Sequence, residues 1–188
     1  MPPGETSLIT LRLHGTIPAA AARELRAGLR QAHEAGADHR RAQKAFFARF
    51  DAVLDRALVG QRYFDHEKIA EALAGEIMML EETGFVVHAF AILPNHAHVV
   101  LHLPAGYRLS FAQAIDLLHQ RTGQSCRRLL RPRLPPEASF WQEGWHEYSI
   151  ADAAELARIV AYVRGQARQA GLPLRFQAWP YVSEPVKQ

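Results

Sequence analysis

The hydrophobic and polar positions of the chain follow two different periods. Short runs rich in apolar and β-branched residues predict strands at Ser7–Leu13, Phe85–Leu93 and His96–Leu103. Longer segments with helical spacing lie at Ala19–Ala35, Asp38–Leu58 and Asp65–Glu82, then from Ser110 to about Leu130 and from Asp152 to about Gln169. Irregularly spaced aromatic residues predict a weaker strand within Ser139–Ile150.

The connections between these segments indicate the fold class. Only Pro94-Asn95 separates the second and third strands, which favours an antiparallel hairpin. The order strand, helices, strand, strand, helix, strand, helix predicts an α+β fold with a largely antiparallel, ferredoxin-like sheet and helices packed on it. We expect one domain over residues 1–188, with the helices at 19–58 inserted between the first strand and the first core helix.

Composition narrows the function classes. The 188 residues carry 22 basic and 19 acidic side chains, and 48% of the residues are hydrophobic, as in ordinary globular proteins. The apolar stretches are shorter than a membrane span, and no secretory leader is apparent, so we expect no membrane association. The single cysteine, Cys126, excludes an internal disulfide and is typical of the reducing cytoplasm, where we expect the protein to reside.

The strongest local signal is the sequence Pro94-Asn-His-Ala-His98. Residues i and i+2 of a strand point to the same face, about 6.6–6.8 Å apart, so the His96 and His98 imidazoles can converge on one metal ion. The alternative is two partly exposed histidines on a sheet face without a ligand. Motifs typical of nucleotide-binding loops and of serine hydrolases do not occur in the sequence.

Two helices carry further candidate groups. On the last helix, Tyr162 falls at the edge of the apolar stripe, Gln166 follows one turn later and Arg158 precedes it by one turn. A tyrosine in such a place is more often a packing residue with its hydroxyl in water. The segment 117–136 is rich in arginine and contains no acidic residue, which predicts either a phosphate-contacting surface or a solvated helix end.

Taken together, these segments resemble the HUH single-tyrosine transposases and, among them, the REP-associated tyrosine transposases. The resemblance rests on LPNHAHVVLHLP, on Phe140-Trp-Gln142 with Glu147, on Ala161-Tyr162-Val163 through Gln166, and on Trp179-Pro-Tyr-Val-Ser183. It covers Ser7–Leu13 and about residues 63–183, and it leaves the helices at 19–58 unaccounted for.

The resemblance implies a chemistry and a set of residues. Tyr162 would attack a DNA phosphodiester and form a 5′-phosphotyrosine, while His96, His98 and Gln166 would hold one Mg²⁺ or Mn²⁺ ion. It implies a single-stranded or hairpin DNA substrate that is bound by a monomer or a homodimer. The unpaired bases of this DNA would stack on aromatic residues such as Trp141 or Trp145. Glu147 is a candidate local base or a residue that supports the metal ligands. The candidate phosphate contacts are Arg121, Arg127, Arg128, Arg131 and Arg158.

Three hypotheses therefore stand. The first is a metal-dependent DNA transposase that cleaves and rejoins single strands at hairpin-flanked sites. The second is a domesticated protein that binds DNA hairpins without transposition activity, and the third is another metallohydrolase that shares the two histidines. The charge distribution favours a DNA-binding half, because residues 1–84 carry a net charge of −1 and residues 85–188 a net charge of +4.

Overall fold

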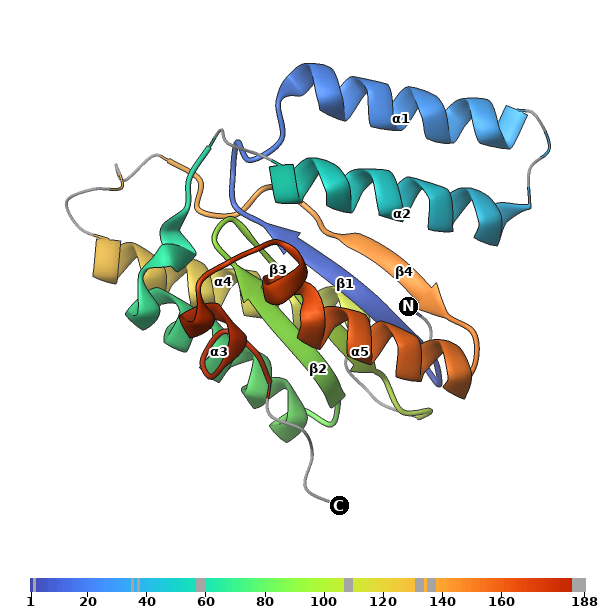
Figure 1. Cartoon of the computed structure of the whole chain (residues 1–188). Coiled ribbons are helices and arrows are strands. Elements are labelled where there is room, and N and C mark those ends of the chain that lie inside the picture. The colour runs from blue at the N-terminus through green and yellow to red at the C-terminus, as the bar shows by residue number, and fades with distance from the viewer. Residues whose placement is uncertain are drawn as a thin grey trace.

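The fold is built on one antiparallel sheet. The computed structural model describes residues 1, 3–34, 36, 38–56, 60–106, 110–130, 134 and 138–183. Within these residues the strands are β1 (Thr6–Arg12), β2 (Val86–Leu93), β3 (His96–His102) and β4 (His146–Ile150). The sheet order is β2-β3-β1-β4, and each neighbouring pair is antiparallel (Figure 1). This order is that of a ferredoxin-like sheet, so the predicted α+β class is confirmed.

The helices follow the sequence prediction closely. They are α1 (Ala19–Glu34), α2 (His39–Arg56), α3 (Glu67–Glu82), α4 (Phe111–Leu130) and α5 (Ala153–Gln169), with short 3-10 turns at Tyr63–Asp65 and Leu174–Gln177. None of these helices combines the length and apolar character that a membrane crossing needs. The strand expected within Ser139–Ile150 is shorter than predicted: it begins at His146, and Trp141 forms a single bridge to Leu13 instead.

Cap residues fix the helices that carry candidate site residues. The Asp152 carboxylate accepts a hydrogen bond from the Glu155 amide (2.7 Å) and starts α5, as a capping residue does. Ser110 caps α4 in the same way through the Gln113 amide (3.2 Å). Gly84 ends α3 with a φ of 91°, a backbone conformation that favours glycine. The helix starts predicted at Ser110 and Asp152 are therefore confirmed.

The two faces of the sheet differ in composition. On β3, Ala97, Val99 and Leu101 point to the face that α3 and α4 cover, where they join the large apolar core. The alternate residues His96, His98 and Val100 point to the other face, which α5 and α2 cover. The strands thus separate an apolar layer from a layer with buried polar groups.

The α1–α2 hairpin is an antiparallel pair of helices between β1 and α3 in chain order (Figure 1). Its two helices share a small apolar cluster around Ile17, Phe50 and Leu54. Phe47 of α2 instead packs with Leu8 and Val163 in the layer between the sheet and α5. The helical segment near the N-terminus is therefore present as predicted, and its second helix packs on the sheet.

Candidate functional site

The two histidines of β3 form the base of the site. Their ring centroids are 4.8 Å apart, and both side chains are buried. The Nδ1 atom of His98 lies 2.9 Å from the Thr10 hydroxyl on the neighbouring strand β1. The Nδ1 atom of His96 lies 2.7 Å from Asn95 Oδ1. Each ring is thus held through Nδ1, which leaves Nε2 to face the interior of the site.

Asn95 fixes the tautomer of His96. The Asn95 amide donates its Nδ2 hydrogen to the backbone carbonyl of Leu54 (3.3 Å), so Oδ1 must be the atom that faces His96. A carbonyl oxygen can only accept, and therefore Nδ1 of His96 carries the proton and Nε2 keeps its lone pair. Burial, followed by the nearby His98 charge, lowers the pKa of His96 to about 3. His96 is consequently neutral near pH 7, as a metal ligand must be.

A carboxylate that the sequence analysis did not select completes this cluster. Asp51 of α2 is buried, and its Oδ1 lies 2.9 Å from His98 Nε2. Burial alone would raise the pKa of Asp51, but the close contact and charge of His98, together with His96 and Gln166, lower it overall. The available signal was an aspartate between apolar positions of an amphipathic helix, which sequence spacing alone could not connect to a strand 45 residues away.

Asp51, His96 and His98 form a group that could hold a metal ion. One ligand atom from each residue lies within 4.8 Å of the other two. Asp51 Oδ1, His96 Nε2 and His98 Nε2 are buried and make no hydrogen bond in the described part of the chain. Buried polar atoms are rarely left without a partner, so a converging set of such atoms fits a cation. The carboxylate suits Mn²⁺ and Mg²⁺, and imidazole nitrogens are ligands of divalent transition metals.

Tyr162 and Gln166 of α5 lie against the same group. The Tyr162 hydroxyl donates a hydrogen bond to Asp51 Oδ2, and Gln166 Nε2 donates to Asp51 Oδ2 (3.0 Å) and to the Tyr162 oxygen (3.2 Å). Gln166 Oε1 is buried and makes no hydrogen bond within the described residues. Small residues on β2, Ala89 and Ala91, pack with Val163 and allow α5 to lie close to the sheet. Four sequence-selected residues, His96, His98, Tyr162 and Gln166, are thus brought together.

Aromatic rings and a further histidine line the side of the site. Phe47 of α2 has its centroid 6.1 Å from that of His98 and 6.4 Å from that of Tyr162. His146 of β4 stacks with Phe47 at 6.0 Å, and burial lowers its pKa to about 4. The sequence analysis did not select either residue: Phe47 lies on a segment without a recognised motif, and His146 lies next to Glu147 but is not itself part of the resemblance.

Glu147 is not part of this cluster. Its register partner on β1 is Ile9, whose side chain belongs to the apolar core under α3 and α4, so Glu147 points to the opposite face of the sheet. There its carboxylate accepts a hydrogen bond from the Ser7 hydroxyl (3.0 Å) and pairs with the amino group of Met1 (3.1 Å). The prediction of Glu147 as a local base at the tyrosine is therefore corrected by its position. Trp141 is corrected likewise: it is buried, and its indole donates to Thr122 (2.8 Å).

The predicted arginine contacts divide between two helices. Arg158 is exposed on α5, one turn before Tyr162. Arg121, Arg127 and Arg128 lie on α4, which packs on the opposite face of the sheet. Arg127 donates to the Ala138 carbonyl, and Arg128 is exposed at the helix end. Arg131 lies outside the described residues.

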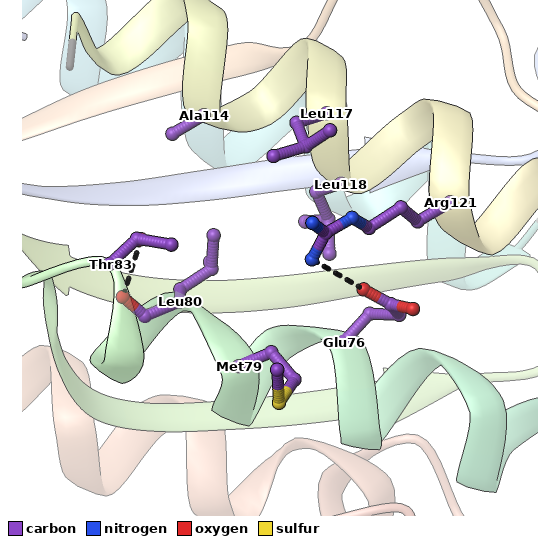
Figure 2. Close-up of a pocket in the computed structure, with 8 residues that line it drawn as sticks. All are labelled: Glu76, Met79, Leu80, Thr83, Ala114, Leu117, Leu118 and Arg121. Carbon is purple, nitrogen blue, oxygen red and sulfur yellow. Dashed lines mark hydrogen bonds and ion pairs between the residues drawn. The ribbon is translucent and has the colours of Figure 1, made fainter.

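Arg121 borders a shallow pocket that is separate from the histidines. Its guanidinium lies 3.7 Å from the Glu76 carboxylate, and the pocket floor is formed by Leu80, Ala114 and Leu118 between α3 and α4 (Figure 2). Met79 and Thr83 complete the α3 side. The pocket lies on the apolar side of the sheet, so the sheet separates it from the cluster around Asp51.

Comparisons with known proteins agree with this arrangement. No protein-family model matches the chain. A curated REP-associated tyrosine transposase of Haemophilus influenzae is 27% identical over 107 residues, which make up 55% of this chain and 61% of the length of that relative. A solved structure of a REP-associated tyrosine transposase bound to a REP hairpin covers 96% of this chain and 77% of its own, with a TM-score of 0.55 and 14% identity. At that identity the structural match establishes the shared fold, and the two comparisons together confirm the similarity of this chain to the HUH single-tyrosine transposases of the REP-associated group.

Proposed function

We propose that the protein is a metal-dependent DNA transposase that cleaves and rejoins single strands at hairpin-flanked sites through a 5′-phosphotyrosine. One observation carries the proposal: the Tyr162 hydroxyl lies within the same buried cluster as the two histidines, linked to them through Asp51. Neither a packing tyrosine nor an unrelated metal site requires a nucleophile in that position. The names of the similar proteins, a REP-associated tyrosine transposase and one bound to a REP hairpin, support the same substrate class.

In the proposed reaction the residues of this chain have distinct tasks. The Tyr162 oxygen attacks phosphorus, the bond from phosphorus to the 3′-oxygen breaks, and the phenolic proton is replaced by a proton on the departing 3′-hydroxyl. Because the phosphoester bond is exchanged and not hydrolysed, rejoining is the reverse attack by a 3′-hydroxyl and requires no ATP. A bound divalent ion supplies polarisation of a non-bridging phosphate oxygen. We propose that His96, His98 and Gln166 hold that ion, and that the exposed Arg158 contacts the DNA backbone.

The test is formation of a covalent protein–DNA adduct. The full chain is incubated with Mn²⁺ and a labelled oligonucleotide that carries a hairpin with single-stranded flanks, and the products are separated under denaturing conditions. We expect an adduct with the wild type, no adduct with Tyr162→Phe, and an undiminished adduct with Tyr148→Phe. Tyr148 is a suitable control because it lies in the same layer but its hydroxyl donates to Glu155 (2.6 Å). An adduct of equal yield with Tyr162→Phe would contradict the assignment of the nucleophile.

A hairpin-binding protein without transposition activity is the second candidate. The observation that favours it is the burial of the cluster, since His98 is 0% and Gln166 is 1% exposed and a phosphate has to displace a neighbouring group to reach them. Tight hairpin binding by the wild type, without any adduct over a range of hairpins and flanks, would support this candidate over the transposase.

A further inference from the structure

Helix α2 belongs to the segment that the family motifs leave unaccounted for, yet one side of it faces the site. Phe47 and Asp51 lie one helical turn apart, and both contact residues of the cluster. Leu54, three residues further on, accepts the Asn95 hydrogen bond that orients His96. The helix therefore acts on both histidines, on His98 through Asp51 and on His96 through Asn95.

The two oxygens of Asp51 face different partners. Oδ1 lies beside His98 Nε2, on the side where the candidate ligand atoms converge. Oδ2 accepts hydrogen bonds from the Tyr162 hydroxyl and from Gln166 Nε2. One carboxylate with 4% exposure thus joins the nucleophile on α5 to the histidines on β3.

The geometry of the contact between Asp51 and His98 points to a cation next to Oδ1. Oδ1 lies 2.9 Å from His98 Nε2, but neither atom forms a hydrogen bond with correct geometry, and both are buried. A carboxylate kept only for an ion pair with His98 would be expected to accept such a bond. A shared cation satisfies both atoms, and the added negative charge suits Mg²⁺ or Mn²⁺ better than neutral ligands alone.

We propose that Asp51 is a ligand of the divalent ion and also positions Tyr162, so that the α1–α2 hairpin is part of the catalytic centre of this chain. This inference rests on the proposed function. One oxygen binds the ion, and the other holds the tyrosine side chain in the orientation that the attack needs. On this proposal the α1–α2 hairpin supplies a residue of the site through Asp51.

The inference differs from two simpler roles for Asp51. A purely structural carboxylate would affect folding but not the affinity for a metal ion. A carboxylate that blocks the site, by occupying the place of the substrate phosphate, would slow adduct formation, and its removal would accelerate the reaction. The three roles predict different results for the same variants.

The first measurement is Mn²⁺ affinity without DNA, by titration calorimetry on the full chain. Asp51→Asn keeps the shape and removes the charge, and we expect its Mn²⁺ dissociation constant to rise by about 10-fold or more. Glu24→Gln is the matched control, because it removes a negative charge from the same hairpin at an exposed position, and it should bind Mn²⁺ like the wild type. Unchanged Mn²⁺ affinity in a folded Asp51→Asn protein would overturn the inference.

The second measurement is the rate of adduct formation over a range of DNA concentrations at saturating Mn²⁺. We expect Asp51→Asn to lower the maximal rate by at least about 10-fold with little change in the half-saturating DNA concentration, because positioning acts on the chemical step. Asp51→Glu keeps the charge, guards against a folding defect, and should restore Mn²⁺ affinity more than it restores the rate. Faster adduct formation by Asp51→Asn would overturn the inference in favour of a blocking role.

Failure of this inference is distinguishable from failure of the proposed function. A wild-type protein that forms no adduct contradicts the transposase activity, whereas the metal-ligand role of Asp51 is still decided by Mn²⁺ affinity. A wild type that forms the adduct while Asp51→Asn matches it in both measurements contradicts the role of Asp51 alone.

Discussion

The two faces of the four-stranded sheet bury different kinds of side chain. Towards α3 and α4 the side chains of β3 are Ala97, Val99 and Leu101, and they pack into a continuous apolar core. Towards α5 and α2 the same strand presents His96 and His98, which meet Asp51, and several of their buried atoms make no hydrogen bond within the described residues. Apolar burial stabilises a fold, whereas buried polar atoms without partners destabilise it. We therefore expect the α3–α4 face to contribute more to stability than the face that carries the buried histidines.

The largest expected effect on stability comes from the apolar face. Leu101→Ala removes a side chain with 0% exposure from the centre of the core. We expect the free energy of unfolding to fall by about 2–5 kcal/mol, as for other buried leucines. Urea denaturation measures this change, and the adduct yield per folded molecule should be unaffected. A loss below about 1 kcal/mol would contradict the view that this face carries the stability.

Binding of the ion at the histidine face should increase the free energy of unfolding of the protein. At a free Mn²⁺ concentration of 100 times the dissociation constant, the wild type should be stabilised by about 2.7 kcal/mol, because the ion binds the folded state. His96→Ala should lose this increment, and a chelator should abolish it in the wild type. Leu101→Ala serves as the control, since it should keep the increment on a lower baseline. Equal stabilisation of His96→Ala by Mn²⁺ would show that the ion binds elsewhere.

Acid should destabilise both faces through the partly buried histidines His119 and His146. Burial lowers the pKa of His119 on α4 and of His146 on β4 to about 4, from 6.5. Between these values the unfolded chain binds protons that the folded chain does not, so stability is present above about pH 6.5 and is lost as the pH falls towards 4. Each histidine should contribute a loss of about 2 kcal/mol between pH 7 and pH 5.

The matched variant for this pH effect is His119→Gln. Its free energy of unfolding in urea should fall less between pH 7 and pH 5 than that of the wild type, by the share of one histidine. His119 is suited to the test because it stacks on Trp141 in the core layer, away from the proposed metal ligands. An identical pH dependence of the variant and the wild type would contradict the lowered pKa.

The sequence could predict the elements whose signals are local. The Pro94-Asn95 connection identified the β2–β3 hairpin, and Asp152 and Ser110 identified the starts of α5 and α4. The period of 2 placed His96 and His98 on one face, and the helical period placed Tyr162 beside Gln166. These groups could be selected because each pair lies within one element.

The sequence could not predict the groups that meet across distant elements. Asp51 reaches His98 only because α2 folds back over the sheet, and no spacing rule within the chain encodes that return. The face of the sheet to which Glu147 points could not be predicted, for a related reason. A strand position has a definite face only once its register is known, and the pairing of Glu147 with Ile9 turns its side chain towards the core side.

The smallest expected effects are on DNA binding. They distinguish the α5 surface, which carries Arg158, from the α4 surface, which carries Arg121. Arg158 is exposed on α5 close to Tyr162, whereas Arg121 faces Glu76 at 3.7 Å beside the pocket between α3 and α4. If the DNA follows the histidine face, Arg158→Ala should weaken hairpin binding a few-fold and reduce the salt dependence by about one single-strand phosphate contact, a slope change of about 0.7. Arg121→Ala should change neither quantity. Fluorescence anisotropy between 50 and 200 mM salt measures both, and equal losses would mean that the DNA also contacts α4, as the full set of predicted arginines implies.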